Sequence, residues 1–534
     1  MTLMRPPESV RQPVRAAKPT PALLSLPPDA APPARDFARL AGLVPLLGAA
    51  AMMPWLMIGL LHPPFAIQLV LGVVSVLLVL TAAMLVVAGV ARSDLGIARW
   101  RIGSWHLLWS SLVLGVLSLQ WLENDPSAGF NWVSLIDRSS VIGALAMVAV
   151  AYGAWAVGYR LGPPRLIVGL ATTALSTVLG GSRSVLRGPA MPWLVYGLGT
   201  AGYLVNFALT GRYGYVGDPT VSLSNPMATT QPVYFVSQMT LVGVGGAAFR
   251  AFDPMIRGGR ATLWTLFAIE LLTGMLRGSK EAFFLTMLAV LIPYGAVRRR
   301  LPWHLLAASV VLLLAVAVPF NAAYREIVRQ NNPTGGVDSA SLSSALSSAP
   351  NVLSDSLKSA DGRQRSNDVF LFRIRMIDSV AIVWQRTPTQ IPYLDPVRFL
   401  RAPFIGMVPR AIWPDKPVEN PGWMFGQVYF DQPPTIFSAS AVTPVSDLYR
   451  SGGWPILLPG MLIMGMGYRM FDGLFRPEAD PRAFAFIIAV FPSAVKAESD
   501  YYTMLTSLPA HLVIGILGAW LMCRSSKRLP LPGG

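Results

Sequence analysis

Short clusters of arginine, lysine and carboxylate residues beside apolar segments are the parts of this chain best suited to chemistry. The first cluster is Arg277-Gly278-Ser279-Lys280-Glu281, which separates two apolar segments. Charged groups at a membrane boundary are costly unless water, a partner or an anionic ligand compensates them. Two interpretations fit: either Arg277 and Lys280 reach out to an interface, or they bind a diphosphate at the start of the next helix.

The second cluster lies in the long polar segment Asn321 to Gly453, which holds thirteen Arg or Lys and eleven Asp or Glu. Ordinary surface ion pairs would account for many of these charges. Flat aromatic faces stack on sugar rings, but Trp and Tyr also gather at bilayer interfaces. The candidate residues of this segment are Arg325, Arg373, Arg375, Arg398, Arg401, Arg410, Trp413, Asp415, Lys416, Trp423, Tyr429, Asp447 and Tyr449.

The third cluster is the short polar turn Lys496 to Tyr502 between the last two apolar segments. A carboxylate here, Glu498 or Asp500, can accept a proton from an attacking hydroxyl group. A solvated turn explains the same residues equally well.

The composition predicts a multi-pass membrane protein. The 534 residues are 53% hydrophobic and only 13% charged, with a mean hydropathy of +0.50, which is more apolar surface than one soluble core can bury. The net charge of +16 comes from clusters at the ends of apolar segments, so nucleic-acid binding is not expected. One cysteine permits no intrachain disulfide, and the four histidines lack the neighbours of a metal site, so neither a metal nor a cofactor is predicted.

Hydropathy predicts an all-α polytopic integral membrane protein with about twelve transmembrane helices and a large extracytoplasmic loop. By the positive-inside rule both termini are cytoplasmic. Of five middle segments, 166–180 is short and flanked by arginines, so we expect it not to cross. The predicted divisions are a disordered cytoplasmic tail (1–39), a bundle of about nine spans (40–320), the extracytoplasmic loop (321–453) with a Ser-rich mobile part (334–366), three closing spans (454–523) and a cytoplasmic tail (524–534).

The chain resembles the bacterial oligosaccharide repeat-unit polymerases, the Wzy-type O-antigen and exopolysaccharide polymerases. The resemblance rests on Arg277 to Glu281 opening a span, on Pro409-Arg410-Ala411-Ile412-Trp413-Pro414-Asp415-Lys416-Pro417 in a long outer loop, and on Asp447-Leu448-Tyr449 before Gly452-Gly453-Trp454. The proline-rich run is the most specific of these. The resemblance covers roughly residues 250 to 468.

This resemblance implies a GT-C-like glycosyltransferase in the bacterial inner membrane, acting at its outer face without metal or cofactor. Its substrate would be a polyprenyl-diphosphate-linked oligosaccharide, and its partners would be membrane lipid and the chain-length regulator and flippase of the pathway. The expected catalytic residues are Glu281, Asp447, Arg410 and Asp415. The expected diphosphate- and glycan-binding residues are Arg277, Lys280, Arg325, Arg373, Arg375, Trp413, Lys416, Tyr449 and Glu498.

Three other functions remain open from the sequence. One is a lipid-linked glycan flippase or transporter, which would carry out no chemistry. Another is a structural membrane subunit of a glycan export machine. The third is an O-antigen ligase-like transferase. Related ligases use a histidine in their large outer loop, and Asn321 to Gly453 contains none, so the ligase activity is less expected.

Overall fold

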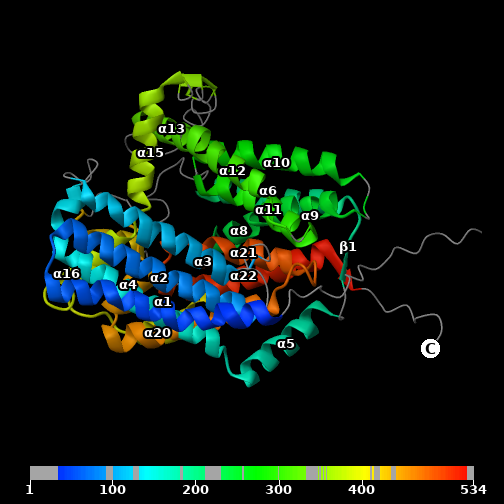
Figure 1. Cartoon of the computed structure of the whole chain (residues 1–534). Coiled ribbons are helices and arrows are strands. Elements are labelled where there is room, and N and C mark those ends of the chain that lie inside the picture. The colour runs from blue at the N-terminus through cyan, green and yellow to red at the C-terminus, as the bar shows by residue number, and fades with distance from the viewer. Residues whose placement is uncertain are drawn as a thin grey trace, which may run out of the picture.

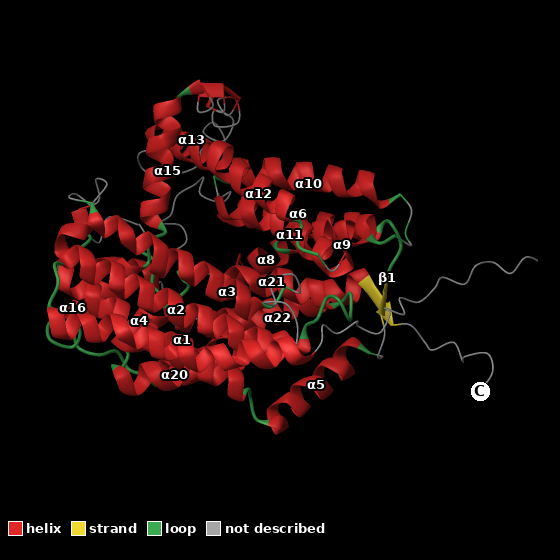
Figure 2. Ribbon diagram, viewed as in Figure 1, coloured by secondary structure: helices red, strands yellow, loops and turns green. Residues whose placement is uncertain are grey.

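The computed structural model is built from helices, with one pair of short strands (Figures 1 and 2). It describes residues 34–91, 100–123, 131–180, 184–210, 230–254, 256, 258–278, 280–298, 300–331, 347, 350–352, 354–355, 358–408, 412–413, 416, 421–433 and 440–525.

The amino-terminal half contributes the following elements: α1 (Ala34–Leu61), α2 (Phe65–Ala91), α3 (Ile102–Ser110), the π-helix η1 (Ser111–Gly115), the 3-10 helices η2 (Val116–Leu122) and η3 (Asn131–Leu135), α4 (Arg138–Leu161), α5 (Arg165–Leu179), β1 (Ser184–Leu186), α6 (Met191–Thr210), α8 (Thr230–Ser237) and α9 (Met239–Phe252).

The remaining elements are α10 (Gly259–Leu276), α11 (Lys280–Arg298), α12 (Trp303–Leu312), the π-helix η4 (Leu313–Ala317), α13 (Val318–Asn331), α15 (Ala360–Arg373), α16 (Ile377–Arg386), α17 (Arg398–Met407), α18 (Pro421–Tyr429), α19 (Pro444–Arg450), α20 (Trp454–Leu474), α21 (Ala483–Val495), α22 (Tyr501–Met522) and β2 (Cys523–Ser525).

Seven helical segments among the described residues are long and apolar enough to cross a membrane, by length and composition. They are 42–61, 65–90, 102–122, 138–161, 280–298, 303–324 and 501–522. Many large apolar side chains on the outside of these helices are exposed, among them Leu60 at 78% and Trp303 at 69%. Such a surface is typical of contact with lipid rather than water, which agrees with the expected membrane protein.

The bundle has two opposite ends, which we name after buried aspartates. At the Asp472 end, Asp472 of α20 accepts hydrogen bonds from the backbone N–H groups of Ile102 and Gly103 (2.7 and 3.2 Å) and from the hydroxyl of Tyr159 (2.9 Å). At the Asp447 end, α16, α17 and α19 pack on α4 and α22. Figure 1 shows α16 and β1 on opposite sides of the molecule.

Close helix packing depends on glycines where α4 meets α20. A Cβ added at Gly158 would overlap the carbonyl oxygen of Leu462, and one at Gly465 would overlap that of Trp155. Small residues at such crossings let two backbones approach closely, as is common between membrane helices. These glycines therefore set how closely α4 and α20 approach each other.

Several element boundaries differ from those expected. Helix α1 begins at Ala34, inside the stretch predicted to be a tail, and α13 continues past residue 320 to Asn331. Helix α15 begins at Ala360, inside the predicted mobile part, whose earlier residues fall mostly outside the described ones. Strand β2 holds Cys523 to Ser525 in antiparallel pairing with β1, so the first residues of the predicted carboxyl-terminal tail are structured.

Candidate functional site

Asp447 in α19 is fully buried and its carboxylate is bound from three directions. The guanidinium of Arg450 donates to Oδ1 from Nε and Nη2 at 3.0 and 2.8 Å, and Arg398 donates to the same oxygen. The backbone N–H of Tyr502 donates to Oδ2 at 3.0 Å. Burial alone would raise the pKa of Asp447, but Arg450 and Arg398 hold it below its ordinary value.

Local sequence positions this carboxylate. Helix α19 starts with a capping box in which Thr443 and Ser446 satisfy each other's backbone N–H groups, and Pro444 occupies the first turn. Because α19 has only seven residues, this cap fixes most of its backbone. Asp447 and Arg450 lie one turn apart on the same face and form an ion pair there.

Arg398, the first residue of α17, joins three helices at this point. Its guanidinium carbon lies 5.4 Å from the ring centroid of Tyr502, and the neighbouring Phe399 packs edge-on against Tyr501 at 5.3 Å. The Nε atom of Arg398 is buried and donates to no acceptor among the described residues. Burying an N–H group without a hydrogen-bond partner costs free energy. An added acceptor, such as an oxygen of a bound ligand, would satisfy this group.

Asp500 stands beside this cluster as the N-cap of α22. Its Oδ1 accepts the backbone N–H of Thr503 at 2.7 Å, and the residue is only 7% exposed. Burial, together with the neighbouring negative charge of Asp447, raises the pKa of Asp500 to about 6. The two carboxylates therefore differ: one is held ionised by arginines, and the other accepts a proton near neutral pH.

On its other side the 496–500 turn contacts α11. Lys496 Nζ lies 2.5 Å from Oε1 of Glu281, at the start of α11. Burial raises the pKa of Glu498, and the charge of Lys496 opposes that shift. The Oε2 atom of Glu498 is buried and has no hydrogen-bond partner within the described part of the chain. The turn thus carries an acceptor that lacks a donor, just as Arg398 carries a donor that lacks an acceptor.

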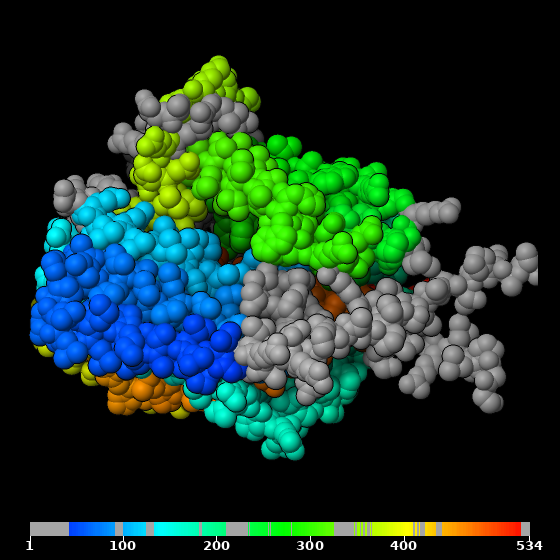
Figure 3. Space-filling view, viewed as in Figure 1, coloured from blue at the N-terminus to red at the C-terminus, as the bar shows by residue number. Residues whose placement is uncertain are grey.

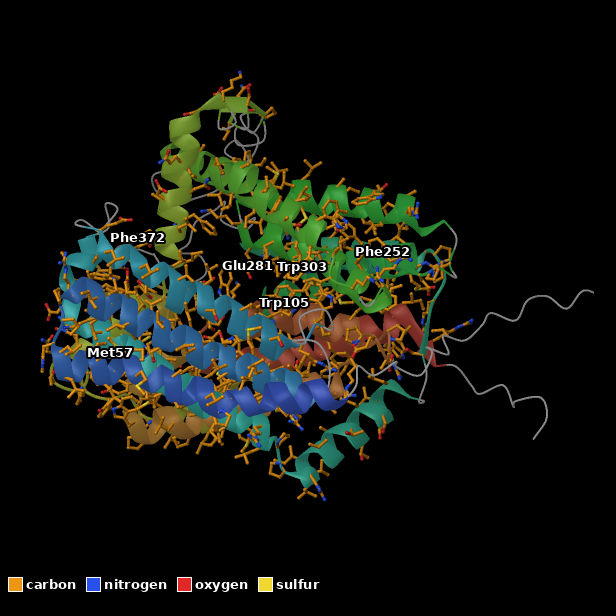
Figure 4. The ribbon with its side chains drawn as sticks, in the orientation of Figure 1. Met57, Trp105, Phe252, Glu281, Trp303 and Phe372 are labelled. Atoms are coloured by element: carbon orange, nitrogen blue, oxygen red, sulfur yellow. The ribbon has the colours of Figure 1, made fainter. Side chains whose placement is uncertain are left out.

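Figure 3 shows a recess between the α10–α13 helices and the α2–α3 helices. In Figure 4, Glu281 lies in the middle of the molecule, near the boundary between these two groups of helices. The 496–500 turn, whose Lys496 pairs with Glu281, therefore lies near the boundary between the α10–α13 helices and the α2–α3 helices.

Arg277 and Lys280 flank Glu281 but are engaged with protein groups. Arg277 is buried, donates to Oε1 of Glu270 at 2.6 Å, and has its guanidinium 4.3 Å from the ring centroid of Tyr203. The ammonium group of Lys280 lies 4.6 Å from the ring centroid of Phe370 in α15. Both cations therefore lie near the turn, with aromatic faces beside them.

Arg375 belongs to a different cluster. It forms a bidentate ion pair with Asp378, at 3.0 Å from Nε to Oδ1 and 2.8 Å from Nη2 to Oδ2, and Trp121 donates to the same carboxylate at 3.0 Å. Arg373, two residues earlier, is exposed. The hydrogen bond from Trp121 connects Asp378 of α16 to the end of η2. Within the described residues, no hydrogen bond or ion pair joins Arg375 or Asp378 to Asp447.

The other expected residues divide into three groups. Tyr449 is buried against Trp384 and Trp454, with ring centroids 5.7 and 6.0 Å away. Lys416 is buried and donates to the carbonyl of Val408 at 3.0 Å, whereas Trp413 is 39% exposed. Three residues lie outside the described part in whole or in side chain: Arg410, Asp415 and Arg325.

The structure brings Arg398, one of the arginines noted in the long polar segment, and the backbone of Tyr502 to Asp447, and it gives Lys496 and Asp500 definite partners. Arg398 is 49 residues from Asp447 in the sequence, and Tyr502 is 55 residues from it. No spacing rule connects residues so far apart. The signal that the sequence did offer was the density of carboxylates in the 496–500 turn.

Comparison with known proteins gives one match. Residues 231–471 match the model of a family described as a domain of unknown function, DUF8712. No curated protein and no solved structure matches the chain. The matched stretch runs from α8 into α20, so it includes Glu281, Arg398 and Asp447, while the 496–500 turn lies beyond it.

Proposed function

We propose that the protein joins polyprenyl-diphosphate-linked oligosaccharide repeat units into a surface polysaccharide or exopolysaccharide at the outer face of the bacterial inner membrane. The observation that carries the proposal is the pairing at the Asp447 end of two unlike carboxylates, one bound by two arginines and one with a pKa of about 6. A glycosyl transfer needs a proton acceptor for the attacking hydroxyl and fixed positive charge for the leaving diphosphate.

The proposed topology puts the Asp447 end outside. Twelve crossings would be made by α1, α2, α3 to η2, α4, α6, α8 with α9, α10, α11, α12 to α13, α20, α21 and α22. Helix α5 would remain on the inner surface, because it begins next to the end of α4 and ends at Gly180, whose carbonyl accepts from Arg482 at the start of α21. We place the Asp472 end on the cytoplasmic side because arginines gather near it, as the positive-inside rule expects.

In the proposed reaction, a hydroxyl of the incoming lipid-linked unit attacks the anomeric carbon of the growing glycan. A new carbon–oxygen bond forms, the bond from the anomeric carbon to the diphosphate breaks, and polyprenyl diphosphate leaves with the electron pair. The hydroxyl proton passes to Asp500 or Glu498. Asp447 is assigned a positioning role, since its oxygens already accept from Arg398, Arg450 and Tyr502.

Positive charge for the diphosphate is assigned to Arg398 and Lys496, and secondarily to Arg277 and Lys280, which flank Glu281, the partner of Lys496, in the sequence. Arg398 has a buried Nε available for an added acceptor. Lys496 is partly exposed, at 27% of its side chain, so an anionic ligand can reach it. Arginine and lysine stabilise charge that develops on a leaving phosphate oxygen.

The test is polymerisation by the purified protein. Lipid-linked repeat units are extracted from a strain of the native host that lacks this gene, mixed with the full-length protein in lipid vesicles, and separated by chain length. A ladder of longer lipid-linked chains is expected from the parent protein. Asp500→Asn and Glu498→Gln are compared with Asp431→Asn, whose carboxylate forms an exposed ion pair with Arg386.

The alternatives give different results in the same assay. A flippase would move the lipid-linked unit across the vesicle membrane without lengthening it. A ligase would transfer the glycan only when a lipid-core acceptor is supplied. A parent protein that yields no longer chains, although the units are intact and accessible on both faces, would overturn the polymerase assignment.

A further inference from the structure

A cationic pocket lies at the Asp472 end, on the opposite side of the bundle from the candidate site. Its volume is about 210 Å³, and five segments of the chain contribute to its walls. The lining residues are Leu179, Arg187, Arg482, Ala519, Trp520, Cys523 and Arg524. The pocket combines three arginines with the apolar end of a long membrane-type helix.

The protein itself neutralises one of these three arginines. Arg482 pairs with Asp480 at 2.6 Å and donates to the carbonyl oxygens of Leu179 and Gly180 at 3.2 and 2.7 Å. No carboxylate within the described residues pairs with Arg187 or Arg524. The pocket therefore keeps positive charge that its own walls do not cancel.

Arg187 is fixed in place at the pocket wall. Its Nε donates to the carbonyl of Cys523 at 2.9 Å, its backbone N–H donates to the carbonyl of Met522 at 2.8 Å, and its guanidinium carbon lies 5.9 Å from the ring centroid of Trp520. Its own carbonyl accepts from Arg250 at 2.5 Å. Positive-inside topology alone requires only mobile basic residues on loops, whereas this guanidinium is held by the carbonyl of Cys523, and the backbone of Arg187 is bound by Met522 and Arg250.

The apolar surroundings match an acyl chain. Trp520 is 60% exposed beside the pocket, and the adjoining α5 exposes Leu170 and Val178 at 64% and 54%. Helix α5 contacts α22, so these side chains continue the surface of a helix apolar enough to span a membrane. A ligand with a phosphate at one end and hydrocarbon at the other would fit both features.

We propose that this pocket binds the phosphate of an anionic phospholipid, with the acyl chains lying along α22 and α5. Arg187 and Arg524 would bind the phosphate oxygens, because arginine presents several donors in a planar fork. Trp520 would lie at the level of the headgroup, where its amphipathic ring is favoured. This lipid site does not depend on the function proposed for the Asp447 end.

Native mass spectrometry of the full-length protein in detergent tests the proposal. The protein is titrated with phosphatidylglycerol, phosphatidylcholine and inorganic phosphate, and the bound fraction is measured. We expect preferential binding of phosphatidylglycerol, weakened about fivefold in Arg524→Gln and further in the Arg187→Gln/Arg524→Gln double variant. Arg524 is exposed, so its replacement leaves the fold intact.

The control is Arg469→Gln, which removes a cation at the same end but outside the pocket; Arg469 donates to the carbonyl of Tyr159 at 3.3 Å. It is expected to bind phosphatidylglycerol like the parent. Equal weakening in Arg469→Gln and Arg524→Gln would mean that diffuse charge attracts the lipid, and the pocket would be rejected. The lipid assignment also fails if phosphatidylcholine binds equally well, or if inorganic phosphate binds as tightly as the lipid.

Discussion

Lys496 and Glu281 form an ion pair of 2.5 Å that attaches the 496–500 turn to the start of α11. The pair is partly exposed, with 27% of the lysine side chain and 44% of the glutamate side chain accessible, so it contributes less than about 1 kcal/mol to stability. In the proposed reaction this pair holds Lys496 two residues from Glu498, so we expect it to affect activity more than stability.

Replacing Lys496 by Gln is predicted to reduce chain growth about a hundredfold, the usual effect of removing one group that stabilises a leaving oxyanion. Glu281→Gln leaves the ammonium group in place and should retain most of the activity. Product ladders from the vesicle assay measure both, and thermal unfolding in detergent should show little change for either. Equal activity of Lys496→Gln and the parent would remove this lysine from the proposed site.

Asp447→Asn is predicted to destabilise the protein strongly. The substitution leaves Arg398 and Arg450 next to each other without their shared counter-charge, and breaking a buried ion pair in this way costs about 3 to 5 kcal/mol. Scanning fluorimetry of the purified variant measures the loss. Asp431→Asn, which breaks an exposed pair with Arg386, serves as control and should cost less than about 1 kcal/mol.

Asp500→Asn is predicted to change how stability depends on pH. The pKa of Asp500 is raised from 3.8 to about 6 on folding, so the folded chain holds this proton more tightly than the unfolded chain does. The resulting stability is present below pH 4 and is lost as the pH rises through 6. Asparagine stays neutral and also caps helices.

The Asp500→Asn variant should therefore exceed the parent in stability at pH 7.5, by at most about 3 kcal/mol. The two should unfold alike near pH 4. Unfolding temperatures recorded at both pH values check this, and a difference that does not vary with pH would contradict it. Activity should be lost at every pH if Asp500 accepts the hydroxyl proton.

Gly406→Ala is predicted to disturb the site from a distance. Gly406 lies where α17 packs on α22, and an added Cβ would overlap the carbonyl oxygen of Thr506. Overpacking of this kind typically costs about 1 to 3 kcal/mol and would displace Arg398 at the start of the same helix. Gly467→Ala is the matched control, because a Cβ there meets nothing within 4 Å. A Gly406→Ala variant with the parent's unfolding temperature would show that α17 can shift freely.

Local hydropathy was sufficient to predict most of the long helices. Hydropathy predicts spans at about 65–90 and 483–495, and these correspond to α2 and α21. For the last span, hydropathy predicts about 508–522. Helix α22 begins seven residues earlier, at Tyr501, because Asp500 caps it and two tyrosines reduce the hydropathy of its first turn. Hydropathy depends on neighbouring residues only, so it recognises a span but not its cap.

Contacts between distant segments were beyond prediction from one sequence. Residues 369–384 have the apolar spacing of a helix. In the structure this stretch is interrupted between α15 and α16, where the backbone N–H of Met376 donates to the carbonyl of Val113. Within the long polar segment, α16 packs on α4 and α17 packs on α22, and hydropathy does not identify these partners. Likewise, the contact between Arg398 and Asp447 is made by tertiary packing, so the spacing of residues along the chain does not predict it.

The pairing of β1 with β2 has a consequence for synthesis of the protein. Val185 is paired with Arg524, so the strand that leads into α6 receives its partner only when the last residues of the chain have been translated. The cationic pocket and the hydrogen bond from Arg187 to Cys523 depend on the same carboxyl-terminal residues. A chain that stops before residue 523 would keep its long apolar helices but would leave β1 unpaired, with the backbone N–H and C=O groups of its edge exposed.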